Sequence, residues 1–388
     1  MVISVLYLMV ILMKNVSKYK VNFSLVLSIF LFGVISIVTL YGAKSILPSS
    51  MNHLVMNQAI WYLLGFILAY LVMTIGNTYI YHISFILYIF GVLSLVGLFF
   101  FGITINDARC WYEIKGIGTF QPSEFMKIFL IIMNASFINK FNERCPNPSV
   151  KEEFVFLIKM AIIVLIPSVL TFLQPDTGVV LIYLLITFVM LFISGIRYRW
   201  FAFLFIFVFL TVGSVLFFYF YDKDLFIKIF GTSFFLRVDR LLDWSNQSGY
   251  QLENSLSSIG SAGIYGHGIS KNPVYFPEAQ TDFIFAVFAS HFGFIGSTLL
   301  ICFITFFDIK LITLALKTNK ITDKYIIAGV VGMLIYQQIQ NIGMTFGLLP
   351  ITGITLPFIS YGGSSLLSYM LAMGMIFNIS NENIRYTN

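Results

Sequence analysis

Charged residues are scarce in this chain. Asp, Glu, Lys and Arg together make up 10% of its 388 residues, whereas soluble domains carry roughly 25%. Hydrophobic residues make up 59%, and the mean hydropathy is +0.90. No water-soluble core buries so much apolar surface. The composition therefore excludes a soluble globular protein and indicates that a lipid bilayer is the solvent.

Histidine and cysteine are also few, with four and three residues. No CxxC pair or His/Cys cluster has the spacing of metal ligands, so no metal site is predicted. Cys110, Cys145 and Cys302 are expected in three different compartments, which excludes an internal disulfide. Walker and dinucleotide glycine motifs are absent too, which argues against a pump driven by nucleotide binding to this chain.

Long apolar stretches are what the chain has in abundance. A spanning helix needs about 20 mostly apolar residues. Ten stretches fit, near 23–43, 54–75, 79–101, 124–139, 154–173, 177–196, 199–220, 282–304, 325–345 and 359–379. We therefore predict an all-α polytopic membrane protein with about ten transmembrane helices.

The N-terminal residues 1–22 are predicted to be an extension, cytoplasmic or interfacial. Their first apolar run rises only about 20 Å, short of the roughly 30 Å hydrocarbon core. An eleventh span in this segment is the alternative. The ten-helix membrane domain is expected over 23–380 and a cytoplasmic tail over 381–388.

The distribution of charge predicts the orientation. With ten spans and the N-terminus inside, the inner connections carry more Lys and Arg than Asp and Glu, as the positive-inside bias requires. Both termini are then cytoplasmic. The net charge of +6 reflects topology, so no nucleic acid partner is predicted. The two long polar segments, 102–123 and 222–281, lie outside. The second is a large outer loop between helices 7 and 8, expected to contain short amphipathic helices.

The first outer segment carries the first polar motif. Arg109-Cys110-Trp111 precedes Pro122, which is typical of a helix start. Glu124 and Lys127 are three residues apart on that helix and can pair. An ion pair that only neutralises two semi-buried charges explains this spacing as well as a functional site does.

Two further motifs place an Asp before a helix. Gln174-Pro175-Asp176 is explained by a turn and an N-cap, or by a polar site on the outer side. Asp282 ends the polar run that begins at Phe276. A lone Asp there is more often a cap than a catalyst. However, ionisable groups at this depth are rare and usually face a functional cavity.

The fourth motif runs from Asn341 to Ser365 and is rich in Gly, Ser and Pro. Small residues allow membrane helices to approach closely, which is one explanation. The other is a helix N-terminus near the outer surface, whose free N–H groups suit a phosphate.

Together and in this order, the four motifs resemble the SEDS family of cell-wall polymerases, which includes RodA, FtsW and SpoVE. The resemblance covers roughly residues 23–380 and is most specific in 277–287 and 347–365. The residues at 341–344 are closer to RodA, while Thr355 favours FtsW or SpoVE. Ser290 and His291 depart from the pattern, because the family usually has two acids there.

The resemblance implies a glycosyltransferase that polymerises lipid II into glycan strands at the outer face of the bacterial cytoplasmic membrane. It also implies a class B penicillin-binding protein, a transpeptidase, as partner, alongside other elongation or division proteins. The family's catalytic Asp falls on Asp282, its first-loop Trp on Trp111, and its Glu and Lys on Glu124 and Lys127.

This reaction needs a base for the attacking hydroxyl and groups that hold the diphosphate. Desolvation would raise the pKa of Asp282 from about 3.9 towards a useful base, and in-line displacement would invert the donor linkage. The residues predicted to bind substrate or its diphosphate are Arg109, Trp111, Glu124, Lys127, Gln174, Asp176, Arg237, Gln251 and Ser364.

No cofactor is predicted with certainty, although a divalent cation, Mg or Mn, is an alternative bridge between diphosphate and carboxylates. A different class of function is a flippase that transports lipid II, since Lys127 and Lys159 lie inside predicted spans. A structural scaffold for the division or elongation machinery is a third.

Overall fold

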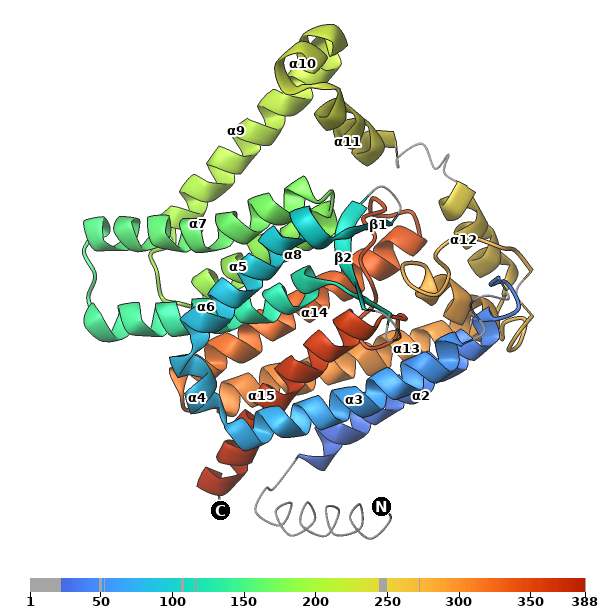
Figure 1. The fold of residues 1–388 in the computed structure, drawn as a ribbon, viewed down its shortest axis with the longest axis horizontal. Helices are drawn as coiled ribbons and strands as arrows, with labels where there is room; N and C mark the ends of the chain where they lie inside the picture. Colours follow the sequence, from blue (N-terminus) through green and yellow to red (C-terminus); the bar gives the residue numbers. More distant parts are fainter. Residues whose placement is uncertain are drawn as a thin grey trace.

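The computed structural model describes residues 22–48, 51, 53–105, 108–114, 116, 118–243, 250–271 and 273–387. Most of the chain is helical, as predicted (Figure 1). The helices are α2 Phe23–Ala43, α3 Leu54–Ile75, α4 Asn77–His82, α5 Ser84–Phe101, α6 Pro122–Arg144, α7 Val150–Leu173, α8 Thr177–Phe192, α9 Arg199–Tyr221, α10 Lys223–Phe230, α11 Thr232–Asp243, α12 Tyr250–Ser261, α13 Ile284–Lys317, α14 Ile321–Thr345 and α15 Gly363–Thr387.

Each of the ten predicted spans coincides with one of these helices, or with two at 79–101. Within the described residues, eight helices are long and apolar enough to cross a membrane. Helix α8 is apolar but shorter, and α6, which carries Glu124 and Lys127, is not among the eight. Length and apolarity thus support a multi-pass membrane protein without confirming the count of ten.

The structure describes the C-terminal end of the chain but little of the N-terminal segment. The N-terminal extension and the possible eleventh span lie outside the described residues, apart from Asn22. The Asn22 side chain accepts a hydrogen bond from the Ser24 N–H at 3.2 Å and caps α2. At the other end, α15 continues through most of the predicted tail to Thr387.

A small antiparallel sheet, which the sequence analysis did not predict, follows α5. Its strands are β1 Ile103–Ile105, β2 Ala108–Ile114 and β3 Gly118–Phe120, in the order β1-β2-β3. Strand β2 pairs with β3 through Tyr112 and Phe120. Because β3 leads into α6 after one residue, the sheet fixes Trp111 close to the start of that helix.

The large loop between α9 and α13 contains three short helices, α10, α11 and α12, so its helical content is as predicted. Helices α9 to α11 project from the bundle, whereas α12 lies beside the N-terminal part of α13 (Figure 1). Only 6% of the apolar segment of α9 is buried within the protein. The apolar side chains of α9 are therefore exposed outside the helix bundle.

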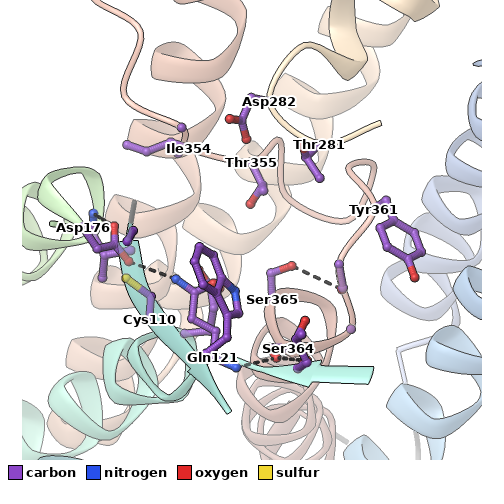
Figure 2. Close-up of a pocket in the computed structure, with 18 of the residues that line it drawn as sticks. Cys110, Gln121, Asp176, Thr281, Asp282, Ile354, Thr355, Tyr361, Ser364 and Ser365 are labelled. Atoms are coloured by element: carbon purple, nitrogen blue, oxygen red, sulfur yellow. Dashed lines mark hydrogen bonds between the residues drawn. The ribbon is translucent and has the colours of Figure 1, made fainter. Parts of the chain in front are cut away.

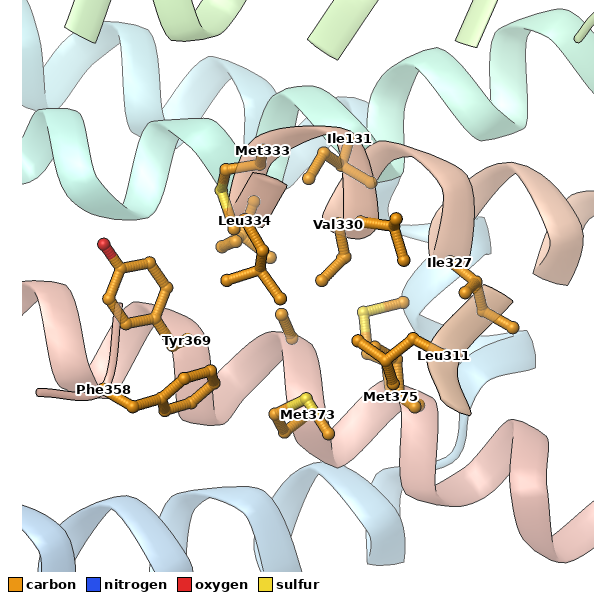
Figure 3. Close-up of a cluster of buried hydrophobic side chains, with 14 of the residues drawn as sticks. Ile131, Leu311, Ile327, Val330, Met333, Leu334, Phe358, Tyr369, Met373 and Met375 are labelled. Atoms are coloured by element: carbon orange, nitrogen blue, oxygen red, sulfur yellow. The ribbon is translucent and has the colours of Figure 1, made fainter. Parts of the chain in front are cut away.

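The core is centred on α14 and α15. Figure 3 shows side chains of α6, α13, α14 and α15 meeting there, together with Phe358 from the segment that precedes α15. Of the apolar segments, 61% of that in α14 and 83% of that in α15 are buried. This packing holds the α14–α15 connection, residues 346–362, against the bundle end that carries the sheet.

Helix α13 is kinked at Gly293, whose φ of 63° and ψ of −159° are non-helical. The segment after α12 lies against the kink, where the N–H groups of Phe294 and Ile295 donate to the carbonyls of Gly263 and Ile264 at 3.0 and 3.1 Å. The kink thereby fastens the end of the large loop onto α13.

Candidate active site

A cavity of about 400 Å³ opens at the end of the bundle that carries the sheet (Figure 2). Its wall is formed by all four polar motifs, although they are far apart in sequence. The carboxylate, amide and aliphatic hydroxyl side chains that line it are Thr119, Gln121, Glu124, Asp176, Glu278, Thr281, Asp282, Gln337, Thr352, Thr355, Ser364 and Ser365. Among the described residues, no Lys, Arg or His lines the cavity, so its fixed charge is negative.

Asp282 lies in the wall as a half-buried residue just before α13. The N-cap of α13 is Phe283, and no side chain caps this helix. Asp282 is therefore not the N-cap, which was the alternative explanation of this residue taken alone, and its carboxylate faces the cavity (Figure 2). A β-carbon at Gly353 would lie 3.5 Å from Asp282 Oδ2, so the absence of a side chain there leaves the carboxylate room.

The turn that carries Asp282 is anchored by hydrogen bonds to α14 and to the α14–α15 connection. The Asn341 side-chain amide donates to the carbonyls of Asp282 and Ile354, both at 2.8 Å. The Ser360 hydroxyl donates to the Thr281 carbonyl at 2.6 Å. Asp282 is thus held by its backbone, which leaves its side chain free for chemistry.

Burial raises the pKa of Asp282 to about 7, and the negative charges of Glu278 and Asp176 add to this rise. Glu278 is held in the left-handed region at φ 55°, a costly conformation for a residue with a side chain. Its carboxylate accepts from the Thr281 hydroxyl at 2.8 Å and from the Gln280 amide at 3.2 Å. These bonds fix Glu278 in the same wall as Asp282.

Asp176 caps α8 and also lines the cavity, so the two explanations of its motif are compatible. One carboxylate oxygen accepts from the Val179 N–H at 3.3 Å, and the other accepts from the Gln121 amide at 2.9 Å. Burial raises the pKa of Asp176 to about 6. The Gln121 backbone N–H donates to the Ser364 hydroxyl at 2.9 Å. Gln121 therefore links the start of α8 to the start of α15.

Glu124 and Lys127 form the predicted ion pair, with 2.8 Å between Lys127 Nζ and Glu124 Oε2. Lys127 is fully buried, and its ammonium lies 5.3 Å from the ring centroid of Tyr369. Glu124 lines the cavity, whereas Lys127 lies behind it. The pair therefore neutralises a buried charge and at the same time borders the site.

Trp111 and Trp61 contribute aromatic surface to the cavity wall. Trp61 comes from α3 and lies close to the start of α15, where a β-carbon at Gly363 would be 2.6 Å from its indole ring. Beside Trp111, the buried Cys110 thiol donates to the Gln174 carbonyl at 2.9 Å. Burial and the charge of Asp176 raise the pKa of Cys110 to about 12, so this thiol is protonated and unreactive.

Five of the predicted site residues do not line the cavity: Lys127, which lies behind it, and four others. Arg109 is exposed and donates to the carbonyls of Gly102 and Phe100. Gln174 is buried and donates to the Leu95 carbonyl at 2.8 Å, which joins the α7–α8 turn to α5. Gln251 is half-buried on α12, and Arg237 belongs to α11, with a side chain outside the described part.

Several residues of the site were not predicted. Gln121 directly precedes Pro122, and Glu278 lies four residues before Asp282, so both are inside the polar motifs. This position is the one sequence feature that could have identified them as site residues. Trp61 stands in an uninterrupted apolar run and gives no sequence signal. Ser290 and His291, which replace the family's acids, are buried in α13 and do not line the cavity.

The side chains do not form a preassembled metal site. Within the residues that the structure describes, no group of three or more His, Cys, Asp or Glu side chains is arranged to hold a metal ion. The carboxylates of Asp176, Glu278 and Asp282 all line the cavity.

Comparisons with known proteins agree with this architecture. The family model FTSW_RODA_SPOVE, described as cell cycle protein, matches residues 19–385. The chain is 34% identical to the probable peptidoglycan glycosyltransferase FtsW of Coxiella burnetii, over 78% of each chain. It is 33% identical to the stage V sporulation protein E of Bacillus subtilis, over 75% of this chain and 76% of that one. It is 32% identical to the peptidoglycan glycosyltransferase MrdB of Escherichia coli K12, over 76% of each.

Two solved structures share the fold. One belongs to a study of the structural coordination of polymerization and crosslinking by a peptidoglycan synthase complex, with a TM-score of 0.76 and 26% identity over 95% of this chain and 99% of that one. The other is the rod shape determining protein RodA of Thermus thermophilus, with a TM-score of 0.67 and 25% identity over 94% and 98%. With its family model matched over nearly the whole length, the chain belongs to the FtsW, RodA and SpoVE family, the SEDS family of membrane proteins.

Proposed function

We propose that this chain is a peptidoglycan glycosyltransferase that polymerises lipid II at the outer face of the bacterial cytoplasmic membrane, in elongation, division or sporulation. The names of its relatives support the activity. The observation that carries the proposal is the position of Asp282. This carboxylate, with a pKa of about 7, lies in a cavity wall to which all four polar motifs contribute.

In the proposed reaction, the Asp282 carboxylate removes the proton from a sugar hydroxyl of the acceptor. The hydroxyl oxygen bonds to the anomeric carbon of the donor as the bond from that carbon to the lipid diphosphate breaks. Attack from the face opposite the diphosphate inverts the linkage. The diphosphate leaves as a stabilised anion, so a strong general acid is not needed. A base whose pKa lies near the working pH suits this role.

Trp111 and Trp61 offer flat apolar surfaces for sugar rings, while Gln121, Asp176 and Ser364 offer hydrogen bonds. Lys127 supplies positive charge behind Glu124. We retain Arg109, Arg237, Gln174 and Gln251 as predicted substrate residues, although none lines the cavity. Arg109 and Gln251 would contact lipid II only beyond it, and Gln174 would act by holding the wall.

For the orientation, we propose that both termini are cytoplasmic and that the cavity opens outward, since the inner connections hold the excess of Lys and Arg. We also propose a class B penicillin-binding protein as partner. The similarity to a chain of a peptidoglycan synthase complex that coordinates polymerization and crosslinking supports this.

The alternative, a lipid II flippase, is less well supported. The relatives of this chain are named glycosyltransferases. The cavity and its acids are formed by the sheet and by the starts of α6, α8, α13 and α15, and are thus at the ends of these helices and not at their middle. Transporters usually bind their substrates near the membrane midplane.

The experiment combines the purified full chain, its cognate transpeptidase and lipid II, and resolves the products on a gel. Wild-type protein is expected to make glycan strands, and Asp282→Asn is expected to lower the rate by about 10²- to 10⁴-fold, the usual contribution of a general base. Asp224→Asn, which alters an exposed Asp on α10, is the matched control and should retain full activity. Normal polymerisation by Asp282→Asn would reject Asp282 as the base, whereas lipid movement without strands would favour the flippase.

A further inference from the structure

A second hollow, of about 370 Å³, lies between the end of α6 and the start of α7, at the opposite end of the bundle from the active-site cavity (Figure 1). Four basic side chains line it, and we call them the basic groove: Lys140, Arg144, Lys151 and Lys159. All four residues are exposed. Among the described residues, the salt bridges involve none of the four.

The one acid in the lining, Glu152, offsets only one of the four positive charges. Glu152 accepts hydrogen bonds from the Ser149 backbone N–H at 2.7 Å and from the Ser149 hydroxyl at 2.8 Å. These bonds form the capping box of α7. With four cations and one carboxylate in its lining, the hollow keeps an excess of positive charge, and Glu152 is held in place by the cap of α7.

Lys159 indicates what kind of anion fits. It lies nine residues after the first residue of α7, about 13 Å along the helix axis, in a helix apolar enough to span a membrane. Its neighbours Val155, Ile158 and Ile162 are 42%, 44% and 52% exposed, so Lys159 lies on the lipid-facing surface. An ammonium at such a depth is costly unless it meets an anion or reaches the headgroup layer.

The floor of the hollow is apolar. Phe137, Phe141 and Phe156 line it, and the rings of Phe141 and Phe156 stack with 4.1 Å between their centroids. A soluble anion gains nothing from such a floor, whereas the glycerol and upper acyl chain of a lipid would cover it. Cations above an apolar floor, beside the first turns of a helix that is long and apolar enough to span the membrane, match an anionic phospholipid.

We propose that the basic groove is a binding site for the headgroup of an anionic phospholipid, with its phosphate between Lys159 and the cations at the end of α6. The site is separate from the active-site cavity and does not depend on the proposed glycosyltransferase activity. It lies at the far end of α6, the helix that carries Glu124 and Lys127.

The test is native mass spectrometry of the full chain in detergent, titrated with 1-palmitoyl-2-oleoyl phosphatidylglycerol or with the matched phosphatidylcholine. Wild-type protein is expected to prefer phosphatidylglycerol by about tenfold or more, since each cation near an anionic lipid strengthens binding several-fold. The variant R144Q/K151Q/K159Q is expected to lose this preference. The control R199Q/K317Q/K324Q removes the same charge from the ends of three other helices, α9, α13 and α14, and should keep the preference.

Three outcomes would overturn the proposal. The first is equal binding of both lipids by the wild-type protein. The second is an equal loss in the control variant, which would make the preference a property of net charge. The third is displacement of phosphatidylglycerol by millimolar inorganic phosphate, which would indicate a soluble anion as the ligand. Thermal unfolding of both variants in the same detergent is expected to match that of the wild-type protein, which would exclude misfolding as the cause of a loss.

Discussion

Lys127 is fully buried against Glu124 and the ring of Tyr369. Removal of one partner of such a pair leaves a buried charge uncompensated, at a cost of about 3–5 kcal/mol. We therefore expect Lys127→Met to lower the thermal unfolding midpoint strongly and to abolish polymerisation.

The double variant E124Q/K127M separates structure from function. Both charges are gone, so its unfolding midpoint is expected to return close to that of the wild-type protein. Polymerisation should stay lost, because we propose that the pair borders the site. Recovery of activity together with stability would show that the pair only neutralises charge.

Asp282 gives a pH prediction. The carboxylate is the active form of the base and its pKa is about 7, so polymerisation should rise with pH through about 7. In Glu278→Gln a neighbouring negative charge is removed, which should move the midpoint to lower pH. Rates across pH 5.5 to 9, with an exposed-acid variant, Glu113→Gln, as control, test this. An unshifted midpoint in Glu278→Gln would argue against the coupling.

The same pKa also has a consequence for stability. Because the pKa of Asp282 is higher in the folded protein than about 3.9, its value in the unfolded chain, the folded protein binds the proton more tightly. The contribution of Asp282 to stability therefore falls as pH rises from 4 through 7. At pH 8, Asp282→Asn is expected to be at least as stable as the wild-type protein, so its loss of activity would not reflect unfolding.

At the scale of the elements, the kink of α13 predicts that a side chain at Gly293 destabilises the protein. At Gly293, φ is 63°, and a β-carbon would lie 2.3 Å from the Gly266 nitrogen and 2.6 Å from the Ile264 carbonyl oxygen. Gly293→Ala should therefore separate the end of the large loop from α13 and lower the unfolding midpoint. Gly213→Ala, in α9, meets nothing within 4 Å and should be neutral or slightly stabilising. Equal behaviour of the two variants would mean that the kink is not needed.

The elements also differ in how far the sequence predicts them. Helices such as α2 and α5 follow from long apolar runs of spanning length that contain no charged residue. Strands β1 and β3 have only three residues each, and β2 does not alternate strictly between apolar and polar residues, so no periodicity distinguishes them from a loop. Asp282 and Asp176 were each explained locally as caps, and only Asp176 is one. The difference arises from tertiary bonds, such as that of Asn341, which lie outside any local pattern.

At the scale of the whole molecule, the proposed orientation can be tested with thiol labelling. Cys145 follows α6 at the proposed inner end, and Glu113 is exposed on β2 at the proposed outer end. In intact cells, a membrane-impermeant maleimide should label a single cysteine at Glu113→Cys, in a background without native cysteines. A protein that retains only Cys145 should react after permeabilisation alone. The reverse pattern would invert the topology.

The resemblance of four separate motifs predicted the family and most of the cavity wall, because each motif supplies part of it. Arg109 was predicted from the same motif but does not line the cavity. It is two residues from Trp111, yet its guanidinium turns to the carbonyls of Phe100 and Gly102 at the end of α5. Trp61 and Trp111 meet at the same cavity only because α3 packs against α15, a contact between segments that no motif joins.

The acidic lining of the cavity couples substrate affinity to protons. An anionic diphosphate that enters beside Asp176 and Asp282 makes their ionised forms still less favourable, so binding should be accompanied by proton uptake. Affinity for the donor would then weaken as pH rises, while the base becomes more active. The two trends oppose each other, and the enzyme is expected to work best within a narrow pH interval set by its own carboxylates.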